Sequence, residues 1–269
     1  MNAKTERLER VAKELRRDVI EMIYAANSGH PGGSLSAADI VAALFFDVMK
    51  YDAENPHLPE RDRFVLSKGH AAPILYAALA RRGYFDRKLL NRLRRFGSPL
   101  QGHPDSRKLA GVDASTGSLG HGIGNAVGMA LSLMLDGSRA RVFCLLGDGE
   151  IQEGSVWESM MAASHFRLDN LVIIIDNNDL QIDGPVREVM NVHPIAAKLK
   201  SFGLETVSID GHNLDQILDA LNTYPCDKPL GIVAHTVKGK GVSFMENNVG
   251  FHGKAPNDAE YKQAMKELL

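Results

Sequence analysis

The sequence has few cysteines, no long apolar run and no excess of charge of either sign. Its two cysteines, Cys144 and Cys226, are too few for a disulfide framework, so we expect a reducing compartment such as the cytoplasm. No apolar run approaches the roughly 20 residues that span a bilayer, and residues 1–7 lack an apolar signal core. With 31 basic and 33 acidic residues, the chain is expected to bind neither membranes nor nucleic acid.

The chain also lacks internal repeats, low-complexity tracts and Pro/Ser-rich linkers, so its 269 residues predict a single domain over 1–269. Strand-like and helix-like segments alternate, which predicts an α/β fold with a mostly parallel central sheet and helices on both faces. The expected strands cover 64–66, 142–146, 171–175, 205–209 and 230–234. The expected helices cover 5–27, a segment from 36, 71–82, 87–96, a segment ending near 137, 195–202, 214–221 and 258–269.

Two short motifs are the most informative part of the sequence. Gly-Asp-Gly at 147–149 and Asn-Asn at 177–178 are separated by 27 residues, and each follows an apolar run typical of a strand buried on both faces. Ligands of an open parallel sheet bind at the carboxyl edge of the strands, and a carboxylate with a carboxamide suits Mg²⁺ or Ca²⁺. Asp148 and Asn178 are therefore predicted to hold a metal, beside glycines that let a diphosphate approach. The alternative is a strand-to-helix turn and a polar loop.

Four histidines, His30, His70, His103 and His252, lie in glycine-containing segments that we expect to be loops. Loops at the edge of a sheet bring distant residues together. Because imidazole titrates near neutral pH, such a group could move protons between hydroxyl and carbonyl oxygens and bind phosphate. Any one of these histidines alone could instead be structural or simply exposed.

Two weaker patterns point elsewhere. Gly122, Gly124 and Gly128 superficially resemble a dinucleotide-binding loop, but no convincing strand precedes them and the spacing is wrong. The basic residues between Arg81 and Arg95 could form an RNA-binding face, but few stacking aromatics accompany them. A solvated helix face or a contact with a partner is the favoured interpretation of the basic segment.

Further segments give the sequence a family resemblance. They are Ser-Gly-His-Pro-Gly at 28–32, Asp-Arg-Phe-Val-Leu-Ser-Lys-Gly-His at 62–70, Gly-His-Pro at 102–104, Thr-Gly-Ser-Leu-Gly at 116–120, Gly-Asn-Ala-Val-Gly-Met-Ala at 124–130, Gly-Asp-Gly-Glu at 147–150 and Phe-His-Gly-Lys-Ala-Pro at 251–256. In order and spacing they resemble the N-terminal, thiamine diphosphate-binding half of transketolase. The resemblance implies the fold of the diphosphate-binding domain and a Mg²⁺-dependent transfer of a two-carbon ketol unit from a ketose phosphate to an aldose phosphate.

The resemblance also assigns roles to individual residues. Asp148, Asn178 and the main-chain carbonyl of Leu180 would hold the metal, which is Mg²⁺ or Ca²⁺. The catalytic residues implied are His30, His70, His103 and His252, of which His30 and His103 would contact substrate oxygens. The cofactor-binding residues implied are His70, Gly117, Ser118, Leu119, Asp148, Gly149, Asn178, Lys238 and His252. The alternative for Lys238 is a solvated loop cation.

Two positions are left open. Glu153 corresponds to a glutamate that the family uses at its subunit interface, but the helix dipole alone favours glutamate in a first turn. His121 stands where full-length transketolases commonly have glutamine, which leaves the local contacts undefined.

The pyrimidine-binding domain of the family, with the glutamate that activates the cofactor, is not found in this sequence. We therefore expect a separate C-terminal transketolase subunit that carries it, in an α2β2 assembly acting on sugar phosphates. One alternative is the α subunit of a 2-oxoacid dehydrogenase, which shares the motif spacing but whose substrates lack hydroxyls for four histidines. Another is a non-catalytic transketolase-like paralogue. Pentose phosphate metabolism and a specialised sugar pathway both stay open.

Overall fold

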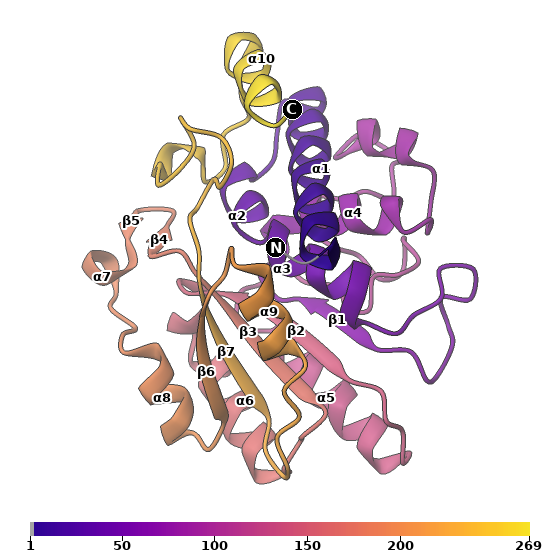
Figure 1. The fold of residues 1–269 in the computed structure, drawn as a ribbon, viewed down its shortest axis with the longest axis vertical. Helices are drawn as coiled ribbons and strands as arrows, with labels where there is room; N and C mark the ends of the chain where they lie inside the picture. Colours follow the sequence, from indigo (N-terminus) through magenta and orange to yellow (C-terminus); the bar gives the residue numbers. More distant parts are fainter. Residues whose placement is uncertain (1–2) are drawn as a thin grey trace.

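The computed structural model describes residues 3–269 and has a parallel sheet at its centre (Figure 1). Its five strands are β1 (Arg63–Leu66), β2 (Val142–Gly147), β3 (Leu171–Asn177), β6 (Glu205–Asp210) and β7 (Leu230–His235). They are ordered β1-β2-β3-β7-β6, and every neighbouring pair is parallel. The register places Gly147 opposite Asp176 and Asn177 opposite His235, so the carboxyl ends form one edge. The predicted α/β fold is confirmed.

Helices cover both faces of the sheet. One side holds α1 (Ala3–Ala26), α2 (Pro31–Ser36), α3 (Ala38–Ala43), α4 (Ala72–Arg81) and α9 (Leu214–Leu221). The other holds α5 (Gly122–Leu135), α6 (Gly154–His165) and α8 (Ile195–Ser201). The last helix, α10 (Asp258–Glu267), lies beside α1 (Figure 1), where the rings of Tyr24 and Tyr261 stack with centroids 4.0 Å apart.

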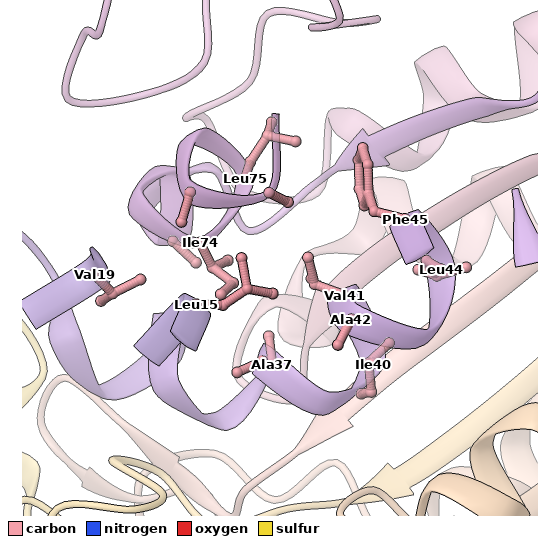
Figure 2. Close-up of a cluster of buried hydrophobic side chains, with 14 of the residues drawn as sticks. Leu15, Val19, Ala37, Ile40, Val41, Ala42, Leu44, Phe45, Ile74 and Leu75 are labelled. Atoms are coloured by element: carbon pink, nitrogen blue, oxygen red, sulfur yellow. The ribbon is translucent and has the colours of Figure 1, made fainter. Parts of the chain in front are cut away.

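Alternation along the strands divides the core into two layers, because successive side chains of a strand point to opposite faces. In β2, Phe143 and Leu145 pack with the α1 side, whereas Cys144 and Leu146 pack with α5 and α6. Figure 2 shows part of the first layer, in which labelled side chains of α1, α3 and α4 meet. The central strands β2 and β3 are therefore buried on both faces, which leaves their carboxyl ends for ligands.

Two segments differ from the predicted helices. The helix expected from residue 36 is α3, which begins at Ala38 and runs into a π-helix, Leu44–Val48. An additional helix, α2, precedes it where a loop was expected, and Pro31 suits its first position because no N–H is needed there. The helix expected over 87–96 is a 3₁₀ helix, Arg87–Arg92, because Leu93 is extended and Arg94 is left-handed, with φ +57°.

The smaller elements surround the edge where the strands end. A two-stranded hairpin joins β4 (Leu180–Gln181) to β5 (Gly184–Pro185), and α7 (Val186–Val189) follows it. Three 3₁₀ turns, Gly69–Ala71, Glu150–Gln152 and Val249–Phe251, also belong to connections. Within residues 3–269, no helix combines the length and apolarity that crossing a membrane requires.

The basic segment does not form a continuous charged face. Arg81 and Arg87 both pair with Asp18 of α1, and the guanidinium of Arg82 lies 4.9 Å from the ring centroid of Tyr51. These contacts attach the segment to the rest of the fold, while Arg82 and Arg87 stay exposed, as the interpretation of a solvated face expects.

Candidate functional site

The predicted motifs meet around a cavity of about 180 Å³ at the carboxyl edge of the sheet. Segments that follow β1, β2, β3 and β7 supply most of its walls. The predicted residues that line it are His70, Leu119, Asp148, Gly149, Asn178, Leu180, Lys238 and His252. Its other lining residues are Gly33, Lys68, Gly147, Glu150, Gln181 and Ile182.

Asp148 presents a buried carboxylate to this cavity, with 2% of the residue exposed. Its two oxygens accept hydrogen bonds from the N–H groups of Gly149, at 2.8 Å, and Asp179, at 2.5 Å. Burial, followed by the charge of Asp176, raises the pKa of Asp148 to about 7, although these hydrogen bonds and Lys238 oppose the change. A cation bound here would reverse that shift, because it favours the ionised carboxylate.

Asn178 and Leu180 add two more oxygens beside Asp148. Asn178 Oδ1 accepts a hydrogen bond from Leu180 N at 3.2 Å, and the Leu180 carbonyl oxygen accepts one from Lys238, another residue that lines the cavity. Among residues 3–269, no group of three or more His, Cys, Asp or Glu side chains could hold a metal. A metal here would therefore rely on one carboxylate with amide and main-chain oxygens, a set that suits Mg²⁺ or Ca²⁺.

Two buried nitrogens at the cavity lack hydrogen-bond partners in the described part of the chain. They are Gln181 Nε2 and His252 Nδ1, and both residues line the cavity. Buried polar atoms are normally satisfied, so these two fit a polar ligand. The cavity also requires glycine at position 149, because a Cβ there would lie 3.1 Å from the Cβ of Gln181. The residues present therefore fit a metal with an attached diphosphate.

Lys238 is buried rather than solvated, with 2% of the residue exposed, so the alternative of a solvated loop cation is wrong. Its ammonium donates to the Leu180 carbonyl oxygen at 2.8 Å. Burial lowers the pKa of Lys238 to about 8, although Asp148 acts in the opposite direction. An anionic ligand in the cavity would favour the charged ammonium.

Three of the four predicted histidines form one group. The ring centroids of His30 and His70 are 5.4 Å apart, those of His30 and His252 5.6 Å, and those of His70 and His252 5.2 Å. Burial lowers the pKa of His30 to about 4 and that of His252 to about 3, and it also holds the pKa of His70 well below its usual value. At neutral pH each ring is uncharged, with one donor and one acceptor nitrogen.

The loop prediction holds only in part for these histidines. His30 immediately precedes α2, and His70 is the central residue of the 3₁₀ helix Gly69–Ala71. His252 directly follows the 3₁₀ turn Val249–Phe251. The glycines around them permit close packing: a Cβ on Gly33 would lie 3.3 Å from His70 Nε2.

His103 lies at the rim, outside the cavity lining. A Cβ on Gly117 would be 3.0 Å from His103 Cγ, so these two predicted residues are in contact. Arg94 links His103 to the histidine group, because its guanidinium is 3.3 Å from His30 Nδ1 and donates to the Gly102 carbonyl oxygen at 3.5 Å. Partial burial and Arg94 lower the pKa of His103. Ser118 is exposed and also lies outside the lining.

His121 and Glu153 lie at the starts of helices. His121 precedes α5, and its Nδ1 is 3.3 Å from the carbonyl oxygen of Leu119. Glu153 precedes α6 and is exposed. Both are therefore adjacent to the cavity wall rather than part of it.

Sequence reasoning missed the buried ion pair beneath the cavity. Lys68 and Asp176 are 1% and 0% exposed, and the Lys68 ammonium pairs with Asp176 and donates to the Gly33 carbonyl oxygen at 2.7 Å. Burial opposes ionisation of Asp176, but Lys68 and the hydroxyls of Ser36 and Thr236 hold its pKa below the usual value. An acidic residue at the end of an apolar strand was the signal that could have found it.

Glu150 is a second residue that sequence reasoning missed. Its carboxylate accepts from the N–H groups of Gly120, at 3.0 Å, and Gly147, at 3.1 Å, and from the Ser67 hydroxyl. Although burial raises the pKa of Glu150, these bonds favour its ionised form. It therefore ties together the three connections that enclose the cavity.

Comparisons with known proteins identify the family of the chain. Residues 8–269 match the family described as transketolase, thiamine diphosphate binding domain. The chain is 44% identical over 263 residues to the 6-deoxy-6-sulfo-D-fructose transketolase subunit SqwG of Clostridium sp. (strain MSTE9), covering 97% of this chain and 96% of that protein. It is 38% identical over 265 residues to an apulose-4-phosphate transketolase subunit of Phocaeicola vulgatus, covering 98% of this chain and 94% of that protein.

The fold is likewise similar to solved structures. The transketolase of Campylobacter jejuni superposes with a TM-score of 0.92 at 34% sequence identity. The match covers 100% of this chain but 43% of that one.

Proposed function

Since this chain belongs to the transketolase family and is an N-terminal, thiamine diphosphate-binding transketolase subunit, we propose that it binds the cofactor through Mg²⁺ held by Asp148, Asn178 and the Leu180 carbonyl. The observation that supports this proposal is that Asp148, Asn178 and Leu180 line one cavity in which two buried nitrogens have no partner. When bound, thiamine diphosphate supplies a nucleophilic carbon and an electron sink for breaking a carbon–carbon bond beside a carbonyl.

The residues of this chain bind and orient the reactants. Lys238 brings a positive charge to the diphosphate side of the cavity, and Gly149 leaves room for the diphosphate. His70 and His252, which line the cavity, face both cofactor and substrate, and His30 completes the group. As neutral imidazoles they can donate to one sugar oxygen and accept a proton from another. His103 contacts the sugar farther out, and Gly117, Ser118 and Leu119 support the cofactor from the adjoining loop.

The transfer itself moves a two-carbon ketol unit from a ketose phosphate to an aldose phosphate. The two subunit relatives are named for a sulfonated and a phosphorylated sugar. We therefore place the substrates among sugars with an anionic group, in pentose phosphate metabolism or a related sugar pathway of the cytoplasm.

A second chain completes the enzyme. This chain covers nearly the full length of two transketolase subunits but less than half of a solved transketolase. We propose a C-terminal subunit that carries the pyrimidine-binding domain, in an α2β2 assembly. This proposal is preferred to the α subunit of a 2-oxoacid dehydrogenase, because the matching family and relatives are transketolases.

The test combines binding and turnover. We expect Asp148→Ala to abolish Mg²⁺-dependent uptake of thiamine diphosphate, measured calorimetrically on the assembled enzyme, because it removes the only carboxylate among the three predicted ligands. Asp183→Asn, which alters an exposed residue of the nearby hairpin turn, serves as the control and should bind normally. Uptake by Asp148→Ala that equals wild type would refute the proposed metal site.

Turnover separates the remaining alternatives. With its partner, the wild-type chain should transfer ketol units between sugar phosphates and should not support lipoamide-dependent decarboxylation of 2-oxo acids. Cofactor uptake without any transfer would identify a non-catalytic paralogue instead.

A further inference from the structure

Asp179 has an unusual backbone conformation directly beside the proposed metal ligands. Its φ is +59°, in the left-handed region that residues other than glycine seldom adopt, although aspartate does so more often than most. This conformation costs about 1 kcal/mol or more for a residue with a side chain. It also lets the Asp179 N–H donate to Asp148 Oδ2 at 2.5 Å. Something must therefore hold Asp179 in place for that hydrogen bond to persist.

The side chain of His193 supplies such a restraint. His193 Nε2 lies 2.8 Å from Asp179 Oδ1, and the His193 side chain is 13% exposed, against 47% for Asp179. An ionised carboxylate only accepts hydrogen bonds, so Nε2 carries the proton and Nδ1 is free to accept. Arg187 Nη2 lies 3.5 Å from Nδ1, and Arg187 Nε lies 3.7 Å from Asp179 Oδ1. Both contacts are therefore satisfied by the His193 tautomer that carries its proton on Nε2.

The backbone on either side of Asp179 closes into a loop. Val186 N donates to the Asp179 carbonyl oxygen at 2.8 Å, next to the pairing of Leu180 with Pro185 in the hairpin. His193 is itself fixed, because its N–H donates to Asn191 Oδ1 at 2.9 Å. The conformation of Asp179 therefore sets both the carboxylate of Asp148 and the path of Leu180, whose carbonyl is another proposed ligand.

We propose that His193 is a positioning residue for the metal site: its bond to the Asp179 carboxylate holds Asp179 left-handed and so keeps the Asp179 N–H on Asp148. His193 touches neither metal nor cofactor in this arrangement. The inference rests on the proposed metal site, and it adds a residue that lies outside the segments by which the sequence resembles transketolase. Outer partners of metal ligands typically contribute about 10- to 100-fold in metal affinity.

The experiment is a double-mutant cycle between His193 and Asp179. Mg²⁺ affinity is measured calorimetrically, in the presence of thiamine diphosphate, on the full chain assembled with its partner subunit. We expect His193→Ala to weaken Mg²⁺ affinity about 10- to 100-fold. Asp179→Gly should bind Mg²⁺ almost as tightly as the wild type, because glycine adopts φ > 0 without strain and keeps the N–H. In the Asp179→Gly background, His193→Ala should have no further effect, because the side-chain link is already gone.

Three further variants guard against a fold defect. His193→Gln offers an amide donor in place of Nε2 and should recover much of the affinity, whereas Asp179→Ala should lose it. The exposed His57→Ala should bind as wild type does. His193→Ala binding Mg²⁺ normally, or weakening it equally in both backgrounds, would overturn the role of His193 while the metal site stands. Absence of Mg²⁺-dependent cofactor uptake by the wild type would overturn the proposed function itself.

Discussion

Arg94 is a single residue that shapes the histidine group from the rim of the site. Its left-handed backbone is held by the bond from Arg94 N to the Leu100 carbonyl oxygen at 2.8 Å. Its guanidinium donates to Ser28 Oγ at 2.8 Å and lies 3.3 Å from His30 Nδ1. Because a guanidinium only donates, His30 Nδ1 accepts, which leaves the proton on Nε2.

The charge of Arg94 should be visible in the titration of His30. After burial, Arg94 is the next contribution that lowers the pKa of His30 to about 4. Removing a positive charge makes protonation easier, so Arg94→Ala should raise the pKa of His30 toward its ordinary value of 6.5. NMR titration of the ring measures this change, with Arg95→Ala as the neighbouring control. An unaltered His30 titration in Arg94→Ala would contradict the assignment.

The sequence predicted the site residues that lie within a motif and missed those whose role depends on a partner distant in the sequence. Asp148 and Asn178 were found because each follows a recognisable strand. The acidic residue Asp176 at the end of β3 is visible in the sequence, but its pairing with Lys68, which follows another strand, leaves no local pattern. His193 was missed for the same reason, since it meets Asp179 through the path of a hairpin.

The start of α5 shows how closely an element is fitted to the site. A Cβ on Gly122 would lie 2.5 Å from Ser67 Oγ and 2.6 Å from Ser67 Cα, so α5 begins in contact with the turn after β1. In the same helix, a Cβ on Gly128 would meet nothing within 4 Å. Alanine should therefore have opposite effects on stability at these two glycines of α5.

We expect Gly122→Ala to lower the free energy of unfolding by about 1–3 kcal/mol, because the methyl group overpacks a contact with backbone. Gly128→Ala should instead raise it by about 0.5–1 kcal/mol through helix propensity. Urea unfolding of the two variants measures both changes. A gain of stability in Gly122→Ala comparable to that in Gly128→Ala would show that Ser67 does not restrain the helix.

The regular elements were predicted where burial on the apolar face dominates. The runs that form β2 and β3 are apolar on both faces, and the structure places them at the centre of the sheet. The sequence did not reveal α2, because Pro-Gly-Gly is typical of a loop and the need for glycine comes from tertiary packing, as of Gly32 against Lys238 and Phe251. Likewise, the left-handed turn at Arg94, which follows the short 3₁₀ helix, depends on a tertiary bond to Leu100.

Over the whole molecule, Asp39 joins the N-terminal helices to the C-terminal part of the chain. Asp39 Oδ2 lies 2.5 Å from Arg16 Nη2 of α1 and 2.7 Å from Nδ1 of His212, just before α9. Burial opposes ionisation of Asp39, but Arg16 and His212 together hold its pKa below the ordinary value of 3.8. Removing one partner of a buried pair leaves an unpaired charge.

Asp39→Asn should therefore lower the free energy of unfolding by about 3–5 kcal/mol at neutral pH. Because the folded pKa of Asp39 is depressed, its ionisation stabilises the fold above the ordinary pKa of 3.8, and this stability is lost as the pH falls through the folded pKa. The difference between wild type and variant should shrink below about pH 4. Urea unfolding from pH 7 to pH 3 tests this, with the exposed Asp136→Asn as control. A pH-independent difference would contradict it.

The fold class was predictable at this scale because parallel strands place their carboxyl ends on one edge. That rule brought the motifs after β2 and β3 together without any knowledge of the helices. The arrangement of the rim was not predictable, because it depends on the order in which β7 enters between β3 and β6.

The residues that line the cavity range from Gly33 to His252, so a ligand bound there would contact segments from most of the chain. A ligand that binds the native state alone shifts the folding equilibrium by mass action, by about 2.7 kcal/mol at one hundred times its dissociation constant. The supply of vitamin B1 would then govern the lifetime of this protein in a cell as well as its rate of turnover.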